Sequence, residues 1–190
     1  MKVNNIKILM TGIFVFLGLS QSGYCKVKDS VEMPDTIRVG THVLTLNGMG
    51  TRKATIFKVK VYTAGLYLES SSSNPTDILN SEQLKRVEMH FVHDAPADKI
   101  RKAWNDSYSV NCKVDCEALK PALEELNASM VDMKPGDRMT FTFYPDSLEV
   151  QVKGNPSFRL GNKEFQKVVL ASWLGAEPPN QELKEGLLGK

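Results

Sequence analysis

The sequence TRKATIFKVKVYTAGLYL, residues 51–68, predicts two long strands joined by a turn near Phe57. Apolar and polar positions alternate from residue 58 to residue 63, which is the period-two pattern of a half-buried strand. In a hairpin that turns at Phe57, Arg52 and Tyr62 stand at equal distances from the turn. Cross-strand partners lie about 5 Å apart on the same face of a sheet. We therefore expect these two side chains to be neighbours.

The Arg52–Tyr62 pair suggests a chemical use for this hairpin. A guanidinium beside a phenol hydroxyl is a good receptor for a carboxylate or an enolate oxygen, because both groups donate hydrogen bonds to anionic oxygen. The alternative is a surface arginine that only stacks on a tyrosine ring. The residues alone leave both interpretations open.

The rest of the chain predicts an α+β fold. No regular alternation of strands and helices is present, so we expect an antiparallel sheet with helices over one face. We find no internal repeat and no long linker, which indicates a single domain. Gly48–Gly50 is expected to be a break between strands. Further strands are expected at residues 35–46, 84–92, 139–144, 148–152 and 157–160, and helices at 76–81, 96–108, 116–131, 163–174 and 180–188.

Residues 1–25 have the order of a secretory signal peptide. Two lysines precede the apolar run Ile8–Leu19, and small and polar residues follow as far as Cys25. This run is shorter than the roughly 20 apolar residues of a membrane-spanning helix. An uncleaved anchor or a buried helix is the alternative. We therefore expect a mature domain of residues 26–190 that is periplasmic or secreted, with no membrane span after cleavage.

Charge and motifs exclude several classes of function. The 190 residues include 24 basic and 22 acidic side chains, a formal net charge of +2. Both excess charges belong to lysines in residues 1–25, so the mature domain is formally neutral and a poor candidate for nucleic-acid binding. The sequence has no phosphate-binding loop, no dinucleotide fingerprint and no GxSxG motif, and we expect no cofactor.

Four further residues have ordinary interpretations. His90 and His93 are three positions apart on an expected strand, so their side chains point to opposite faces and are poorly placed for chelation. We therefore expect no metal site. Trp104 and Trp173 fall on apolar helical faces, where core packing is the expected role.

Cys112 and Cys116 are the two cysteines that remain after cleavage. In an oxidising compartment a C-x-x-x-C pair can close a small loop. We expect a disulfide between them at a loop or at the start of a helix. A redox-active pair and half of a metal site are weaker alternatives, because redox motifs usually have two intervening residues and no second pair exists here.

Two segments of the sequence resemble the chalcone isomerase-like family. Asn47-Gly48-Met49-Gly50-Thr51-Arg52, followed by FKVKVYTAGLYL at residues 57–68, is similar to the central strands of that family. Residues 165–175 and LKEGLLG at residues 183–189 match its closing segment. The resemblance covers most of residues 35–189 and looks like the secreted bacterial branch. It implies an open-faced β-sandwich, with a large antiparallel sheet and a helical layer.

The resemblance implies roles for three residues. Arg52 matches, in its Gly-x-Arg context, the arginine of plant chalcone isomerases that stabilises the developing enolate. Tyr62 stands where the enzymes carry a threonine, as in the non-catalytic branch whose Arg and Tyr hold a fatty-acid carboxylate. Ser172 matches the Ser/Thr of the enzymes' last pocket helix.

Part of the enzymes' catalytic set is not evident. Their asparagine falls near Ala103 or Trp104, and only a shifted register that requires a gap reaches Asn111. A lone arginine can polarise a carbonyl, but proximity and proton handling need partners. The resemblance therefore favours binding over isomerisation.

These observations predict a secreted protein that binds a fatty acid, or a similar small amphipathic carboxylate, through Arg52, Tyr62 and Ser172. The first alternative is an isomerase, an intramolecular lyase, that acts on a chalcone-like or other enone substrate with Arg52 as its catalytic group. The second alternative is an envelope interaction protein whose pocket no longer has a function.

Overall fold

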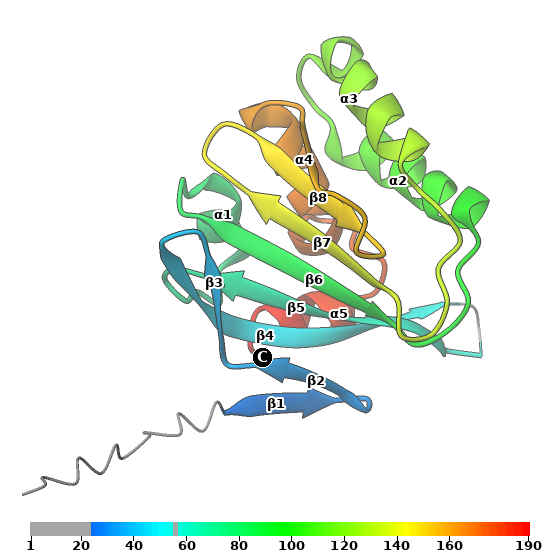
Figure 1. Ribbon diagram of the computed structural model, residues 1–190. Helices are drawn as coiled ribbons and strands as arrows, with labels where there is room; N and C mark the ends of the chain where they lie inside the picture. The colour runs from blue at the N-terminus through cyan, green and yellow to red at the C-terminus, as the bar shows by residue number, and fades with distance from the viewer. Residues whose placement is uncertain (1–23, 55–56) are drawn as a thin grey trace, which may run out of the picture.

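The computed structural model describes residues 24–54 and 57–190 (Figure 1). Nearly all of the predicted signal peptide, residues 1–23, lies outside the described residues. The same holds for positions 55 and 56 in the predicted turn of the central hairpin. None of the helices within the described ranges is long and apolar enough to span a membrane.

A seven-stranded antiparallel sheet is the centre of the fold, in the order β3-β4-β5-β6-β7-β8-β9 (Figure 1). Each strand pairs with the next one along the chain, so the sheet is a simple meander that curls around the helices. The predicted α+β class is confirmed. The strands are β3 (Thr36–Val39), β4 (His42–Ala54), β5 (Val59–Leu68), β6 (Lys85–Phe91), β7 (Arg138–Phe143), β8 (Leu148–Val152) and β9 (Phe158–Leu160).

Helices cover one face of this sheet. The side chain of Asn162 accepts hydrogen bonds from the backbone amides of Glu164 and Phe165, and so caps the predicted start of α4. α4 packs against α2, and α5 packs against β4. The helices are α1 (Pro75–Asn80), α2 (Ala97–Asn111), α3 (Cys116–Ala128), α4 (Lys163–Leu174) and α5 (Gln181–Leu187).

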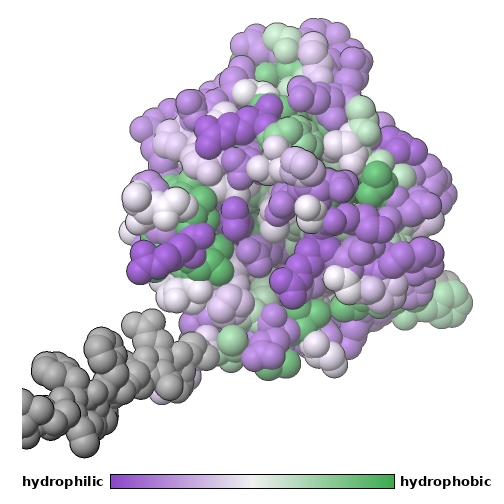
Figure 2. Space-filling model, viewed as in Figure 1, coloured by the Kyte–Doolittle hydropathy of each residue, from purple (hydrophilic) through white to green (hydrophobic). Residues whose placement is uncertain are grey.

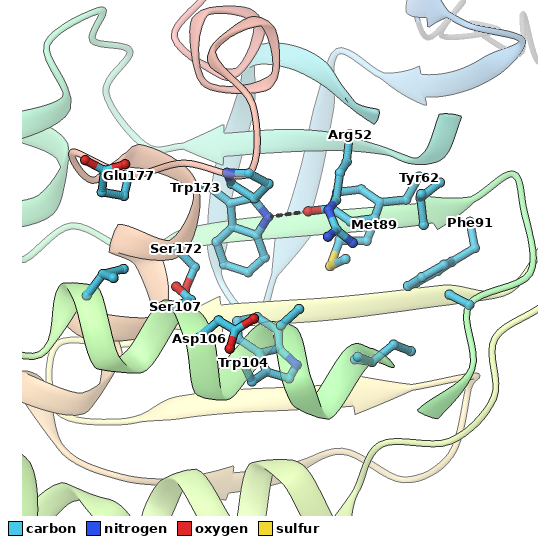
Figure 3. Close-up of a pocket in the computed structure, with 16 residues that line it drawn as sticks. Arg52, Tyr62, Met89, Phe91, Trp104, Asp106, Ser107, Ser172, Trp173 and Glu177 are labelled. Carbon is cyan, nitrogen blue, oxygen red and sulfur yellow. Dashed lines mark hydrogen bonds between the residues drawn. The ribbon is translucent and has the colours of Figure 1, made fainter. Parts of the chain in front are cut away.

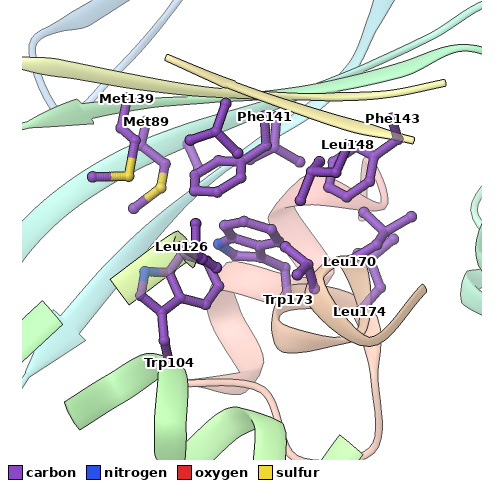
Figure 4. Packing of buried hydrophobic residues seen from close by; sticks show 14 of the residues in the cluster. Met89, Trp104, Leu126, Met139, Phe141, Phe143, Leu148, Leu170, Trp173 and Leu174 are labelled. Carbon is purple, nitrogen blue, oxygen red and sulfur yellow. The ribbon is translucent and has the colours of Figure 1, made fainter. Parts of the chain in front are cut away.

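The main core lies between the sheet and the helices (Figure 4). Phe141 and Phe143 on β7 face the helices, and both side chains are almost completely buried. On the helical side, Trp104 of α2 and Trp173 of α4 pack edge to face, with ring centroids 5.6 Å apart. Core packing of both tryptophans is thus confirmed. Burial of such large apolar side chains is the main stabilising contribution to a fold of this size.

The predicted break at Gly48–Gly50 is wrong, because all three residues lie inside β4. The glycines are needed for packing: a Cβ at Gly50 would overlap the backbone of Leu183 on α5, and one at Gly48 would overlap the carbonyl of Gly186. The irregularity falls one residue earlier, where a register shift leaves Asn47 as a bulge. The side chain of Asn47 donates to the carbonyl of Leu187 at 2.8 Å. Gly48 and Gly50 therefore mark a close approach of β4 and α5, and not a break between strands.

A second hairpin covers part of the other face of the sheet, and the sequence patterns did not predict it. It consists of β1 (Cys25–Lys28) and β2 (Val31–Pro34). Met33 is completely buried against the sheet, and the hydroxyl of Tyr67 donates to the carbonyl of Pro34 at 3.0 Å. A smaller core forms here from eight buried residues, Val31, Met33, Val39, Leu44, Leu46, Met49, Tyr67 and Leu84.

Beyond this hairpin, the outer face of the sheet is polar. The surface in view in Figure 2 is largely hydrophilic, with apolar side chains in small groups. On β6 the outward positions are Arg86, Glu88 and His90, which are partly buried. Their partners on β7 are Thr142, Thr140 and Arg138. Arg86 Nε donates to the Thr142 hydroxyl at 2.9 Å. Alternation of apolar and polar residues along β6 therefore corresponds to a core face and a solvent face.

The predicted disulfide joins Cys112 and Cys116, whose Cα atoms are 5.8 Å apart. Cys112 caps the C-terminus of α2, and Cys116 is the first residue of α3. Between them Asp115 has a φ of 51°, in the left-handed region. The bridge therefore lies at a helix start, as expected, and holds the two helices at their junction.

Candidate functional site

The central hairpin brings Arg52 and Tyr62 together as predicted. They are direct cross-strand partners in the β4–β5 ladder. The register shifts by one residue immediately beyond them, so that Lys53 pairs with Lys60. The guanidinium carbon of Arg52 lies 6.0 Å from the centre of the Tyr62 ring. Both side chains point toward the helical layer rather than toward the polar face (Figure 3).

A cavity of about 300 Å³ lies beside this pair, between the sheet, α2, α4 and the segment that follows α4 (Figure 3). Its wall is mainly apolar. The lining residues are Arg52, Val61, Tyr62, Met89, Phe91, Ala95, Ile100, Ala103, Trp104, Asp106, Ser107, Val110, Ser172, Trp173, Glu177 and Pro179.

Arg52 supplies a positive charge to this cavity. Its neighbours on the hairpin are neutralised, since Lys53 pairs with Glu182 and Lys60 pairs with Asp29. Arg52 has no carboxylate partner among residues 24–54 and 57–190. Its charge is therefore available to an anion that enters the cavity, in addition to its contact with the tyrosine ring.

Tyr62 supplies a hydrogen-bond donor in the same place. Its side chain is buried, and the indole Nε1–H of Trp173 donates to its hydroxyl oxygen at 3.2 Å. Burial raises the pKa of Tyr62 above its ordinary value, so the phenol stays protonated at neutral pH. Because the hydroxyl oxygen is already an acceptor for Trp173, the hydroxyl hydrogen can be donated to a ligand.

Ser172 also lines the cavity, so the structure brings together all three predicted binding residues. The Ser107 hydroxyl on α2 donates to the Ser172 hydroxyl at 2.7 Å, and Asn111 Nδ2 donates to Ser107 Oγ at 3.1 Å. This direction of donation leaves the Ser172 hydrogen free to donate to a bound group. The sequence reasoning missed Ser107, since only the packing of α2 on α4 places it there.

Asn111, which matches the enzymes' asparagine only in a shifted register, is not among the residues that line the cavity. Asn111 reaches the site only through Ser107, whereas Ala103 and Trp104 line the cavity directly. Trp104 and Trp173 thus have two roles, because each is both part of the core and part of the wall.

Two carboxylates lie at the rim on the helical side. Asp106 on α2 pairs with Lys102 at 2.6 Å, and Glu177 follows α4. Both side chains are exposed, unlike the buried Tyr62. The cavity thus has a cationic part at the hairpin and an acidic rim on the opposite side.

His90 lies partly buried on β6, and His93 is exposed just beyond the end of this strand. His90 Nε2 lies 3.8 Å from Glu88 Oε2, and the His93 ring contacts the carbonyl of Asp94. Within the described ranges, no group of three or more His, Cys, Asp or Glu side chains is arranged to hold a metal ion.

This arrangement can hold an oxygen anion through a guanidinium, a neutral phenol and a hydroxyl. All three groups are donors, and the raised pKa of Tyr62 keeps the phenol protonated, so that no phenolate is present at neutral pH to accept a proton. The geometry suits an amphipathic molecule, with an anionic head beside the hairpin and an apolar part against the tryptophans.

Comparisons with known proteins match the chain to a family and to solved structures. The sequence profile of the family described as chalcone isomerase-like matches residues 26–189. The crystal structure of a fatty-acid binding protein from Arabidopsis thaliana aligns with a TM-score of 0.69 at 16% identity, over 87% of this chain and 96% of the plant chain. No curated protein sequence matches the chain.

Proposed function

The chain belongs to the chalcone isomerase-like family, and we propose that it binds a fatty acid or a similar small amphipathic carboxylate without converting it. The observation that carries this proposal is Arg52, which has no carboxylate partner among the described residues, beside the protonated Tyr62 hydroxyl at one side of an apolar cavity. Charge-assisted hydrogen bonds from a guanidinium and a hydroxyl are the strong kind, and together they fix a carboxylate in orientation.

The apolar part of the ligand lies against the aromatic wall. A cavity of about 300 Å³ is at the lower end of the usual range for small-molecule sites, about 300–1,000 Å³. A short or medium acyl chain therefore fits better than a long one. The similarity in fold to a plant fatty-acid binding protein supports this class of ligand.

Binding without conversion is supported by the chemistry of the site. The resemblance places a threonine of the family's enzymes where this chain has Tyr62. At the expected position of their asparagine, Ala103 and Trp104 line the cavity instead. The acceptor carboxylates, Asp106 and Glu177, lie at the exposed rim away from the Arg52–Tyr62 pair. A bound ligand therefore meets donors where its head lies, and no group there is suited to accept a proton.

The isomerase alternative is supported by one observation. Arg52, which matches the arginine of the enzymes, shares the cavity with a pair of hydrogen-bonded hydroxyls, those of Ser107 and Ser172. In that case Arg52 stabilises an enolate, and the serines orient a second oxygen of the substrate. An assay for cyclisation of a chalcone at high protein concentration decides between the two. A rate above background that disappears in Arg52→Ala would establish catalysis.

The protein acts outside the cytoplasm, in the periplasm or as a secreted protein. This part of the proposal is supported by the charge and apolar order of residues 1–25 and by the Cys112–Cys116 disulfide, which needs an oxidising compartment to persist. Cell fractionation followed by intact-mass measurement tests it. A full-length chain recovered from the cytoplasm would contradict it.

The ligand experiment has two steps. The protein is purified from its own compartment and extracted, and the extract is identified by mass spectrometry. Octanoate, laurate and palmitate are then titrated into delipidated protein by calorimetry. We expect a carboxylic acid in the extract and saturable binding of at least one acid. An empty protein that also fails to bind all three acids would overturn the proposal.

Arg52→Ala provides the sharper comparison. Loss of a charge-assisted partner costs about 1.5–3 kcal/mol, so the affinity for the acid should fall by about 10- to 100-fold. The methyl ester of the same acid should bind the wild type and the variant equally. Arg38→Ala, which removes an exposed arginine of β3 outside the cavity, is the matched control. Equal affinity of Arg52→Ala and wild type for the acid would contradict carboxylate recognition.

A further inference from the structure

The end of the β4–β5 hairpin carries an exposed aromatic side chain among lysines. Phe57 is 81% exposed, and Lys58 beside it is also exposed. Lys53 and Lys60 face each other across the two strands. Lys28, the last residue of β1, lies near them, since its charge and that of Lys58 both act on Glu182. We call Lys28, Lys53, Phe57, Lys58 and Lys60 the hairpin-end cluster.

The charges of this cluster are only partly neutralised. Lys53 pairs with Glu182, and Lys60 pairs with Asp29. The Glu182 carboxyl has a lowered pKa, caused first by its hydrogen bond with Lys53 and further by the charges of Lys58 and Lys28. Lys28 and Lys58 have no ion-pair partner within the part of the chain that the structure describes. Four cations and two anions leave a local charge of +2 on a domain that is formally neutral.

The cluster lies next to the mouth of the cavity. Lys53 directly follows Arg52, and the strand ends that bear the cluster project from the body of the domain at the right of Figure 1. The acidic rim residues Asp106 and Glu177 belong to the helical side of the mouth. A negatively charged surface would therefore be attracted to the hairpin end and repelled by the acidic rim.

We propose that the hairpin-end cluster docks this protein on an anionic lipid surface. An aromatic ring is stable at the boundary between water and acyl chains. Lysine stems lie along apolar material while their ammonium groups remain in water, and each lysine near an anionic leaflet is attracted to it. Docking through the hairpin end brings the Arg52 side of the cavity close to the place where an amphipathic carboxylate is concentrated.

A lipid surface fits this cluster better than a protein partner does. Protein interfaces are anchored by side chains that fill well-packed pockets, and they need roughly 800 Å² from each partner. The cluster offers one projecting ring, and its charges are compact, strongly hydrated ammonium groups. Binding of one projecting ring and several ammonium groups to an anionic bilayer does not require a complementary shape.

The test measures binding of the purified chain to vesicles without any added fatty acid. Vesicles of phosphatidylcholine with phosphatidylglycerol are compared with vesicles of phosphatidylcholine alone in a flotation assay. The variant is Phe57→Ser with Lys58→Ser. The matched control is Lys113→Ser with Val114→Ser, another exposed lysine–apolar pair, in the α2–α3 loop. The chain enters α2 from beside β5, where the amide of His93 bonds to the carbonyl of Val61. The control residues follow the opposite end of α2, which has 15 residues and is about 22 Å long, so they lie far from the hairpin. Residues 1–25 are identical in all proteins, so their contribution cancels between variants.

We expect preferential binding to the anionic vesicles that weakens with added salt. The Phe57/Lys58 variant should bind at least tenfold less, since each lysine contributes about fivefold and the ring adds to it. The control variant should bind like wild type. Equal binding of wild type to both kinds of vesicle, or equal binding of wild type and the Phe57/Lys58 variant, would overturn the proposal.

Docking goes beyond the proposed function, and the two can fail separately. Neither Phe57 nor Lys58 lines the cavity, so the variant should bind laurate in solution as tightly as wild type does. Vesicle docking with no fatty-acid affinity would sink only the ligand proposal. Fatty-acid affinity without binding to vesicles would overturn only the docking proposal.

Discussion

Tyr62 illustrates how one hydroxyl serves both the fold and the site. It accepts from the Trp173 indole and offers its own hydrogen to the cavity. Tyr62→Phe removes both functions. We expect the free energy of unfolding to fall by about 1–3 kcal/mol because the indole N–H is left unsatisfied, and fatty-acid affinity to fall by about tenfold. Denaturant titration and calorimetry measure these changes, with Arg38→Ala, an exposed residue of β3 outside the cavity, as control. Unchanged affinity in Tyr62→Phe would show that the phenol takes no part in binding.

Lys85 makes the stability of the protein depend on pH. It is 4% exposed and donates to the carbonyls of Ser81 and Gln83 at 2.6 and 3.0 Å. Burial lowers the pKa of Lys85 to about 8. In the unfolded chain the pKa is about 10.4, so between these values the unfolded state binds more protons and stability rises with pH.

Lys85→Met should remove this rise. The free energy of unfolding of wild type, minus that of the variant, should increase between pH 8 and about pH 10, by up to about 1.4 kcal/mol per pH unit. Urea denaturation at several pH values measures the difference. A difference that stays flat or decreases over this interval would mean that Lys85 keeps an ordinary pKa in the folded protein.

At the scale of residues, the site was partly readable from the sequence. Counting outward from Phe57 paired Arg52 with Tyr62 correctly. The pairs nearer the turn, Lys53 with Lys60 and Ala54 with Val59, have a register that differs by one residue, and the irregularity next to Arg52 restores the counted one. Ser107 could not be found in this way. Its position depends on how α2 packs against α4, and no local pattern encodes that contact.

Among the elements, β4 and α5 pack closely because β4 has glycines where their backbones meet. Gly50→Ala would place a Cβ on the Leu183 backbone. We expect a loss of about 1–3 kcal/mol and faster amide hydrogen exchange over Gln181–Leu187. Gly40→Ala is the control: its φ is +59°, nothing lies within 4 Å, and it should cost about 1–2 kcal/mol of backbone strain without exposing α5. Normal protection of α5 in Gly50→Ala would contradict the packing.

Elements were predicted best where their periodicity is strong and their ends have clear signals. α4 begins after Asn162 and ends before Gly175 as predicted, since cap residues act locally. The glycines of β4 were misread because a glycine pair indicates a turn and a close contact equally well. β1 and β2 have four residues each, and their strand character comes from docking on the sheet rather than from a pattern.

For the molecule as a whole, the sheet has a core on each face, and the smaller one depends on the N-terminal hairpin. Met33→Ala should lower the free energy of unfolding by about 2–5 kcal/mol, because a completely buried side chain is lost. Val27→Ala on the neighbouring strand, where Val27 is 69% exposed, should change little. A single transition at lower denaturant concentration is expected by circular dichroism. An unchanged midpoint would mean that the hairpin is not part of the cooperative fold.

The fold class followed from the sequence because strand order in a meander equals chain order, which leaves few topologies to choose from. Its division into two cores did not follow, since that depends on a segment shorter than any reliable pattern. The cavity could not be located by composition either, because its wall consists of ordinary core residues.

The two tryptophans have a practical consequence. The whole chain contains only Trp104 and Trp173, and both line the cavity. All tryptophan fluorescence of the protein therefore comes from side chains at the wall of the cavity. The indole N–H of one of them, Trp173, donates to Tyr62. The protein carries a built-in optical reporter. Intrinsic fluorescence can follow occupancy of the cavity without labels, including in the presence of vesicles.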